Sequence, residues 1–366
     1  MLVEKYNELN KTNSTNKIDK YFDTITFKRL KGKGLFCGMD FVNLECLKPN
    51  EYYSRFDHSR NVAYSAWKLS EDLPTTLAGA FHDVGSLSFA HVNSFKKNEG
   101  LTQEHDELSI ESVLKEDKEL LSMLEEDNIK LDDVINAKRY PLIDKSIPAL
   151  CLDRVDGILA TCLFFAKTHS FDDVESLYNM LGYLDNLGGM SFDLDNDRFN
   201  NFNGEIALWE NTHAEFEDFF KAIHEYSSIL LTKEDRFMME ILGLTLRYYE
   251  DINLINEKDL FYLSEQEIID KIMDSKYSSV LKDILSIEKV RYANPTDNGI
   301  IFISKPKIRQ ANPVCVNLNY VCEIDGVSGN FYRELNSLGE AIKLTDKPIT
   351  ADLSNQTVQI LKRYRK

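Results

Sequence analysis

Apolar residues recur at intervals of three and four along much of the first half of the chain, which predicts a mainly helical structure. In segment 59–73, SRNVAYSAWKLSEDL, the residues Val62 and Ala66 fall on one side of such a helix. A second helix is expected over 74–85, PTTLAGAFHDVG, because proline suits the first helical turn and Gly85 is placed to end the helix.

Two further segments continue the helical pattern. Segment 108–127, LSIESVLKEDKELLSMLEED, is expected to form one amphipathic helix. Segment 147–169, in which the helix is expected to begin after Pro148, is apolar on most faces, which is typical of a buried central helix. The residues 171–202 are rich in Asp, Asn and Gly and predict a loop or hairpin insertion.

The pattern changes again toward the C-terminus. Helical spacing returns over 206–285, and β-branched residues punctuated by proline and asparagine follow Glu288. We therefore expect a mainly α fold with a small C-terminal α+β region. The expected divisions are a polar N-terminal leader (loose chain or a short exposed helix), a helical core, a loop insertion with a helical extension, and a strand-containing end: 1–25, 26–170, 171–285 and 286–366.

Composition and charge narrow the class of protein. The chain has 366 residues, 43% of them hydrophobic and 28% charged, which is ordinary for a soluble globular protein. Its net charge of −17 argues against a general nucleic-acid-binding surface, yet leaves room for a small basic pocket for one phosphorylated ligand. The chain has six cysteines but no C-x-x-C pair, which predicts reduced thiols. It has no apolar run of membrane-spanning length and no secretory signal, so a cytoplasmic protein is expected.

Histidines are the first sign of chemistry. Four of the seven lie between positions 58 and 105, namely His58, His82, His91 and His105. Asp153 lies in the apolar segment 147–169, where a carboxylate must be paired, hydrogen-bonded or bound to a metal. Consecutive helices can deliver such side chains to one pocket.

His58, His82, Asp83 and Asp153 together form a mixed nitrogen and oxygen ligand set. Such a set suits a divalent ion, with Mn, Fe, Ni, Mg or Zn as candidates, and leaves positions for water and a phosphate oxygen. Each residue taken alone has an ordinary alternative, which is an ion pair or cap for the aspartate and a core or surface position for the histidine. The four residues in this order therefore indicate a metal site more strongly than any one of them does alone.

The order H…HD…D resembles the HD-domain metal-dependent phosphohydrolases, which makes 26–170 a helical HD-domain core with a metal site. The surrounding segments look like the deoxynucleoside triphosphate triphosphohydrolase (dGTPase-like) branch of that family. The resemblance spans Thr26 to Pro313, and its specific motifs end by Thr161. These motifs are FKRLKGKGLF, YYSRFDHSRNVAYSAWKL, AFHDVGSLSFAH, EHDELSIESVL and LCLDRVDGILA.

The resemblance implies roles for individual residues. The implied metal ligands are His58, His82, Asp83 and Asp153. The implied catalytic residues are Asp153 with His91 and His105 as acid/base groups, and the implied phosphate-binding residues are Arg55 and Arg154. The sequence departs from the branch at three positions. Relatives often carry a histidine in place of Ser86. They commonly carry an aromatic residue that contacts the sugar in place of Gly157, and an acidic residue in place of Thr161.

The function implied by the resemblance is hydrolysis of a deoxynucleoside triphosphate to nucleoside and tripolyphosphate. The alternatives are a 5′-nucleotidase or phosphodiesterase of the same superfamily, and a nucleotide-binding sensor without catalysis. The expected partner is a small nucleotide, with no extended nucleic acid and no membrane. A homo-oligomer is possible, because members of the branch are commonly oligomeric, and a monomer is the alternative.

Overall fold

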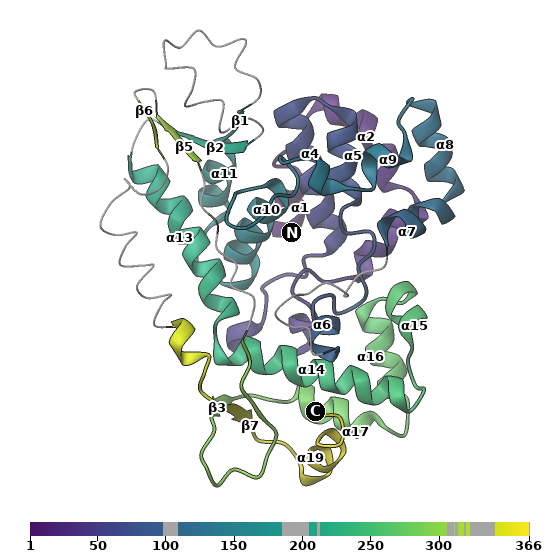
Figure 1. The fold of residues 1–366 in the computed structure, drawn as a ribbon, viewed down its shortest axis with the longest axis vertical. Coiled ribbons are helices and arrows are strands. Elements are labelled where there is room, and N and C mark those ends of the chain that lie inside the picture. Colours follow the sequence, from purple (N-terminus) through teal and green to yellow (C-terminus); the bar gives the residue numbers. More distant parts are fainter. Residues whose placement is uncertain are drawn as a thin grey trace.

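The computed structural model describes residues 1–97, 109–184, 205–210, 213–305, 311, 314–317, 320–322 and 341–365. Helices dominate it, as Figure 1 shows, with the N-terminal half at one end and α14 crossing the other end. The α-helices of the first half are α1 (Leu2–Asn7), α2 (Asn16–Phe22), α3 (Ile25–Lys28), α4 (Arg55–Ser70), α5 (Leu73–Phe81), α6 (Val92–Lys96), α7 (Ile110–Glu116), α8 (Lys118–Glu126), α9 (Leu131–Val134), α10 (Leu152–Ala160) and α11 (Phe171–Asn179).

The second half contributes longer helices and two small sheets. Its α-helices are α13 (His213–Leu230), α14 (Lys233–Asp251), α15 (Glu257–Tyr262), α16 (Glu265–Met273), α17 (Ser278–Leu285) and α19 (Asn355–Leu361). Short 3-10 helices and one π-helical turn complete the helical elements: η1 (Asn13–Thr15), η2 (Arg29–Gly32), η3 (Met39–Phe41), η4 (Glu45–Leu47), η5 (Ala137–Arg139) and the π-helical η6 (Thr161–Phe165).

The strands form a mixed sheet and an antiparallel sheet. The first has the order β1-β2-β5-β6, with β2 and β5 parallel and the other neighbours antiparallel. The second has the order β3-β7-β4 and is antiparallel throughout. The strand bounds are β1 (Leu181–Leu184), β2 (Glu205–Glu210), β3 (Val290–Tyr292), β4 (Ile301–Phe302), β5 (Val314–Asn317), β6 (Tyr320–Cys322) and β7 (Ile349–Ala351). The expected mainly α fold with a small C-terminal strand region is confirmed.

Helix α4 is the centre of the N-terminal half and packs against α5 and α10. It begins at Arg55 because the Ser54 side chain accepts a hydrogen bond from the Asp57 backbone while the Asp57 carboxylate accepts one from the Ser54 backbone. Val62 and Ala66, which the sequence placed on the inner side of this helix, are fully buried. Apolar spacing therefore set the packed face of α4.

Two elements differ from the expected helices. The predicted helix over 108–127 is two helices, because the Asp117 backbone is extended and its carboxylate caps the Leu120 backbone nitrogen at 3.0 Å. The predicted insertion over 171–202 begins with a helix, α11, since Ser170 and Asp173 form a capping box. The residues 185–202 of that insertion lie outside the described part of the chain.

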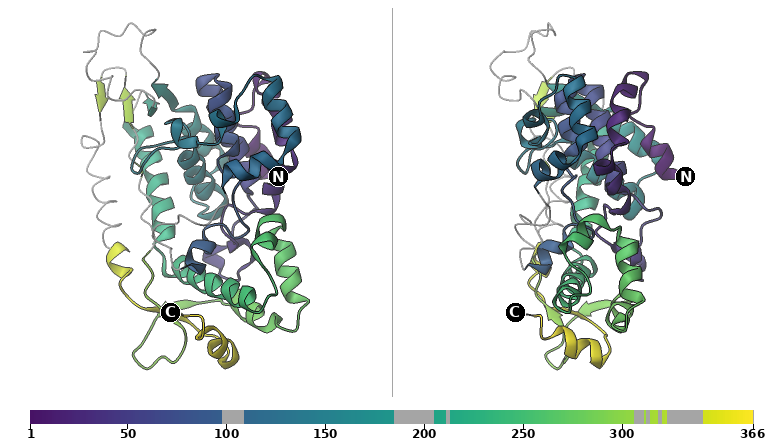
Figure 2. Two further views of the ribbon diagram at one scale, coloured as in Figure 1. Left: turned by 45° about the vertical axis from the view of Figure 1, so that its right-hand side comes forward. Right: turned by 90° about the vertical axis from the view of Figure 1, so that its right-hand side faces the viewer.

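The first 25 residues differ from the loose or exposed leader that their polar composition suggested. They form α1 and α2, and Tyr6, Ile18 and Tyr21 are each at most 1% exposed. The two views in Figure 2 show these N-terminal helices along the outer side of the helical core. A few apolar residues at the right positions are enough to anchor an otherwise polar segment.

Among the described residues, none of the helices combines the length and hydropathy that a bilayer span requires.

Candidate metal centre

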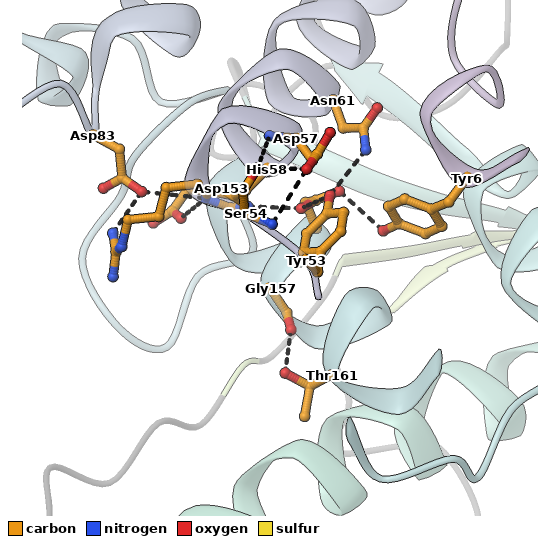
Figure 3. A network of polar contacts seen from close by, with 12 residues as sticks. Tyr6, Tyr53, Ser54, Asp57, His58, Asn61, Asp83, Asp153, Gly157 and Thr161 are labelled. Carbon is orange, nitrogen blue, oxygen red and sulfur yellow. Dashed lines mark hydrogen bonds and ion pairs between the residues drawn. The ribbon is translucent and has the colours of Figure 1, made fainter. Parts of the chain in front are cut away.

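Three helices bring the four predicted ligands together. His58 lies in the first turn of α4, His82 and Asp83 directly follow α5, and Asp153 lies in the first turn of α10. One atom each from His58, His82 and Asp83 lies within 4.8 Å of the other two. Figure 3 shows His58, Asp83 and Asp153 in one polar network.

The ring nitrogens of both histidines face one carboxylate oxygen. His58 Nε2 lies 3.2 Å from His82 Nε2 and 3.1 Å from Asp153 Oδ1. His82 Nε2 lies 3.5 Å from the same oxygen. The Asp153 side chain is 41% exposed, so the cluster is open to solvent on the side of this carboxylate.

Hydrogen bonds at the opposite ring nitrogens fix the tautomers. His82 Nδ1 donates to the Gly79 carbonyl at 2.7 Å, and His58 Nδ1 donates to Asp156 Oδ2 at 2.7 Å. Each Nε2 atom of a neutral ring then carries its lone pair toward the shared centre. Two lone pairs 3.2 Å apart repel each other unless a cation or a proton lies beside them, so the donor set fits a divalent ion.

Asp156 is the residue that holds His58 in place. It is 2% exposed and accepts four hydrogen bonds. The Tyr6 and Tyr178 hydroxyls donate to Oδ1 at 2.9 and 2.7 Å, and the Tyr53 hydroxyl donates to Oδ2 at 2.9 Å beside His58. This carboxylate behind a metal-ligating histidine fixes the ring and raises its basicity.

The protonation of the cluster follows from its charges. Burial alone would lower the pKa of His58, but hydrogen bonds to Asp153 and Asp156 raise it to about 10. Burial also opposes the charged form of His82, and the neighbouring Asp83 and Asp153 carboxylates raise its pKa to about 9. Without a metal ion, protons on these two rings balance the carboxylates, and a divalent ion would displace them.

Asp83 is kept ionised by Arg55. Burial alone would raise the pKa of Asp83, but Arg55 and the two histidines lower it to about 2. The Arg55 guanidinium donates from Nη1 to Asp83 Oδ2 at 2.6 Å, and to Ser86 Oγ at 3.2 Å. Ser86, at the position where the resembled branch often carries a histidine, thus contacts the arginine.

Two cations of the 27–36 motif, the partly buried Arg29 and the fully buried Lys33, position the chain that follows Asp83. Arg29 donates to the carbonyls of Val84 and Ser86 at 2.5 and 2.8 Å. Lys33 is fully buried, and its Nζ donates to Ser88 Oγ at 2.6 Å. Burial and the nearby Arg29 lower the pKa of Lys33 to about 7. Both residues belong to the motif FKRLKGKGLF, but no individual role was predicted for either of them.

The cluster opens into a cavity of about 840 Å³, within the size range of ligand sites. One part of its lining is charged, with Arg55, Lys138, Lys145 and Arg154 among its residues. Another part is apolar and comes from the 35–39 segment, η6, α13 and α14. The apolar lining includes Leu35, Phe36, Met39, Phe165, Ile229 and Met239.

The remaining predicted residues are placed as follows. His91 occupies the N-cap position of α6, where its side chain makes no capping hydrogen bond, and lines the cavity. Arg154 also lines it, but its guanidinium donates to the Lys145 carbonyl at 2.9 Å and to the Ala149 carbonyl, which ties it to the 145–149 loop. His105 lies outside the described residues. The acid/base and phosphate-binding roles of these residues stay predictions.

A second group of possible ligand atoms adjoins the first. Asp144, Cys151 and Asp153 each offer one atom within 4.8 Å of the others. Burial and the neighbouring Asp153 raise the pKa of Asp144, and burial raises the pKa of the Cys151 thiol to about 11. The two-histidine cluster is the stronger candidate, because two imidazole nitrogens already face the shared Asp153 oxygen at 3.1 and 3.5 Å.

Asp156 was not among the site residues predicted from the sequence. The available signal was a second carboxylate, three residues after Asp153, in an apolar helix. Its partners Tyr6, Tyr53 and Tyr178 come from three distant segments, so only the folded structure brings them together.

Comparisons with known proteins show a family match and a shared fold. Residues 55–161 match the HD domain family, so the chain contains an HD domain. It is 23% identical over 291 residues to the uncharacterized protein YdhJ of Bacillus subtilis (strain 168), a match that covers 79% of this chain and 81% of that protein.

Two solved structures share the fold. A phosphohydrolase from Bacteroides thetaiotaomicron VPI-5482 superposes with a TM-score of 0.57 at 14% identity, covering 90% of this chain and 93% of that one. A hypothetical protein from Aquifex aeolicus superposes with a TM-score of 0.54 at 16% identity, covering 95% of each chain.

Proposed function

We propose that this protein is a metal-dependent phosphohydrolase of nucleotides, and specifically a deoxynucleoside triphosphate triphosphohydrolase that releases nucleoside and tripolyphosphate. The observation that carries the proposal is the convergence of His58, His82 and Asp153 on the wall of a ligand-sized cavity. The HD domain over 55–161 and the fold shared with the Bacteroides phosphohydrolase support it.

His58, His82, Asp83 and Asp153 would hold the metal ion. A divalent ion there supplies positive charge that stabilises charge on phosphoryl oxygens and acidifies water. Asp156 keeps the His58 ring in its ligating orientation.

Other side chains would serve the substrate. Arg55 keeps Asp83 ionised and lines the cavity, where its guanidinium suits phosphate oxygens. Lys138 and Lys145 also line the cavity and add positive charge to its lining. His91 lines the same cavity, and its imidazole would exchange a proton with the reacting groups near neutral pH.

A second candidate is a 5′-nucleotidase or phosphodiesterase with the same metal site. Gly157 and Thr161 favour it, because both line the cavity where the resembled branch carries sugar-contacting and acidic side chains. The product separates the two candidates, since tripolyphosphate indicates the first, and orthophosphate or an opened cyclic ester indicates the second.

The test is turnover of a nucleotide panel with Mn, Mg, Fe, Co or Ni added singly. We expect release of tripolyphosphate from at least one deoxynucleoside triphosphate, and loss of both bound metal and turnover in His82→Ala. His169→Ala is the matched control, because His169 lies outside the cavity lining and hydrogen-bonds with its neighbour Thr168. Absence of turnover with every ion and every nucleotide would refute the proposal.

A further inference from the structure

His91 is the last residue of the turn 88–91, which leads directly into α6. Two residues of this turn, Phe89 and Ala90, have positive φ angles of 64° and 34°, a backbone conformation that residues with a side chain rarely adopt. Such a conformation costs free energy and persists only where the surrounding structure imposes it. The place of His91 in the cavity lining therefore depends on the groups that hold this turn.

The Glu265 side chain is one of the groups that hold the turn. Glu265 is the first residue of α16 and is 1% exposed. Its Oε1 accepts a hydrogen bond from the Phe89 backbone nitrogen at 2.8 Å. The Phe89 ring packs over Gly38, where a Cβ would lie 2.6 Å from Phe89 Cδ1. The backbone and the ring of Phe89 are thus each held by a separate segment.

The chain on both sides of the α15–α16 junction also contacts the turn. The Ser88 backbone nitrogen donates to the Leu260 carbonyl at 2.8 Å, and the Ser88 hydroxyl donates to the Leu263 carbonyl at 2.7 Å. Figure 1 shows α6, α15 and α16 at the same end of the molecule. The two carbonyl acceptors belong to the main chain, which any residue supplies. The Glu265 contact depends on its side chain and can be removed by substitution.

A carboxyl group suits this place because it can accept from Phe89 while it is uncharged. A Cβ on Gly34 would lie 2.9 Å from Glu265 Oε2 and 3.0 Å from Asp40 Oδ2, so the two carboxyl groups lie on the same side of Gly34. Burial and the Asp40 carboxylate raise the pKa of Glu265 to about 8, although the buried Lys33 opposes this. A protonated carboxyl keeps a carbonyl-type acceptor, as a glutamine amide does.

We propose that Glu265 is a positioning residue for the reaction, which acts through the Phe89 backbone to hold the His91 imidazole at the cavity. This inference rests on the proposed function for the role of His91 in turnover. Glu265 itself is absent from the lining that the described residues form. Loss of its acceptor lets the turn relax and moves His91, while the candidate metal ligands keep their places. The effect therefore falls on kcat more than on metal or substrate binding.

The first test is hydrolysis of dGTP with Mn²⁺ by variants at this position. Glu265→Met removes the acceptor at similar length and is expected to lower kcat by about 10–100-fold, with KM and Mn²⁺ affinity changed by less than about threefold. Glu265→Asp holds its carboxyl one methylene short of the Phe89 nitrogen and is expected to lower kcat by a smaller factor. Glu265→Gln keeps the acceptor and is expected to keep kcat within about threefold of wild type.

The second test observes His91 without turnover. Its ring signal is measured by NMR with Mg²⁺ present and is assigned by its loss in His91→Gln. The signal is expected to shift in Glu265→Met and Glu265→Asp, and to stay in place in Glu265→Gln. Asp127→Asn is the control, because it removes a carboxylate that contacts Tyr21 and is expected to lower stability without changing kcat or the His91 signal.

An unshifted His91 signal or a wild-type kcat in folded Glu265→Met would overturn the inference, and so would Glu265→Gln behaving like Glu265→Met. If Glu265→Met does not fold, Glu265→Asp and Glu265→Gln decide the matter by the same two readings. A wild-type chain that cleaves no nucleotide refutes the proposed function, and the NMR signal then decides whether Glu265 positions His91.

Discussion

Replacing Asp156 by asparagine tests how the structure prepares its metal site. The substitution keeps the size of the side chain and removes the negative charge that His58 Nδ1 contacts at 2.7 Å. An amide oxygen still accepts from one partner, but it orients and polarises the imidazole less strongly than a carboxylate.

The magnitude follows from the four hydrogen bonds that Asp156 accepts. A hydrogen bond to a charged group exceeds a neutral one by about 1 kcal/mol, so the loss of unfolding free energy is about 2–4 kcal/mol after relief of carboxylate burial. Loss of such a carboxylate behind a ligand weakens metal binding about 10–100-fold, which corresponds to about 1.4–2.7 kcal/mol.

Mn²⁺ titration by calorimetry and urea unfolding measure the two effects separately. Asp127→Asn is the matched control, because Asp127 accepts from the Tyr21 hydroxyl at 2.6 Å in a similar tyrosine–carboxylate contact away from His58. It is expected to lower stability and leave Mn²⁺ affinity unchanged. A folded Asp156→Asn variant that binds Mn²⁺ as tightly as wild type would refute the reasoning.

Three further substitutions test other parts of the structure. Burial and Asp40 raise the pKa of Glu265 to about 8, so the folded state holds a proton that the unfolded state loses near pH 4.5. The unfolding free energy of the wild-type protein should therefore fall by up to several kcal/mol from pH 5 to 8. Glu265→Gln should flatten that decline when unfolding by urea is measured at each pH. Arg55→Met leaves Asp83 buried without its 2.6 Å partner and should cost about 3–5 kcal/mol of unfolding free energy; an unchanged urea midpoint would contradict this. Gly243→Ala forces α14 away from the Lys96 backbone and should lower the unfolding free energy by about 1–3 kcal/mol, which is measured as a lower melting temperature. A higher melting temperature would show that α14 does not need a glycine to approach Lys96.

The helical framework was predictable because its helices are amphipathic. The spacing around Val62 and Ala66 predicted α4, and both residues are buried. The N-terminal segment was not predictable in the same way, since its composition is polar and only a few residues, such as Tyr6 and Ile18, enter the core. Whether a short helix is anchored or loose depends on the surface that receives it, which local sequence does not contain.

The sequence predicted the candidate metal ligands, but it did not predict the residues that hold those ligands in place. His58, His82, Asp83 and Asp153 stand in a recognisable order, and the structure brings them together. Asp156 accepts from residues 22 to 150 positions away in the chain, so its role as the hub behind His58 depends on tertiary contacts.

The cluster of His58, His82, Asp83 and Asp153 is proposed to hold a divalent ion used to cleave nucleotides. Its most direct test is metal content and product identity measured together for wild type, His82→Ala and His169→Ala. We expect a bound divalent ion and nucleotide-derived tripolyphosphate in wild type and His169→Ala, and loss of both in His82→Ala. A His82→Ala variant that keeps its ion and its turnover, or a wild-type chain that has neither, would contradict it.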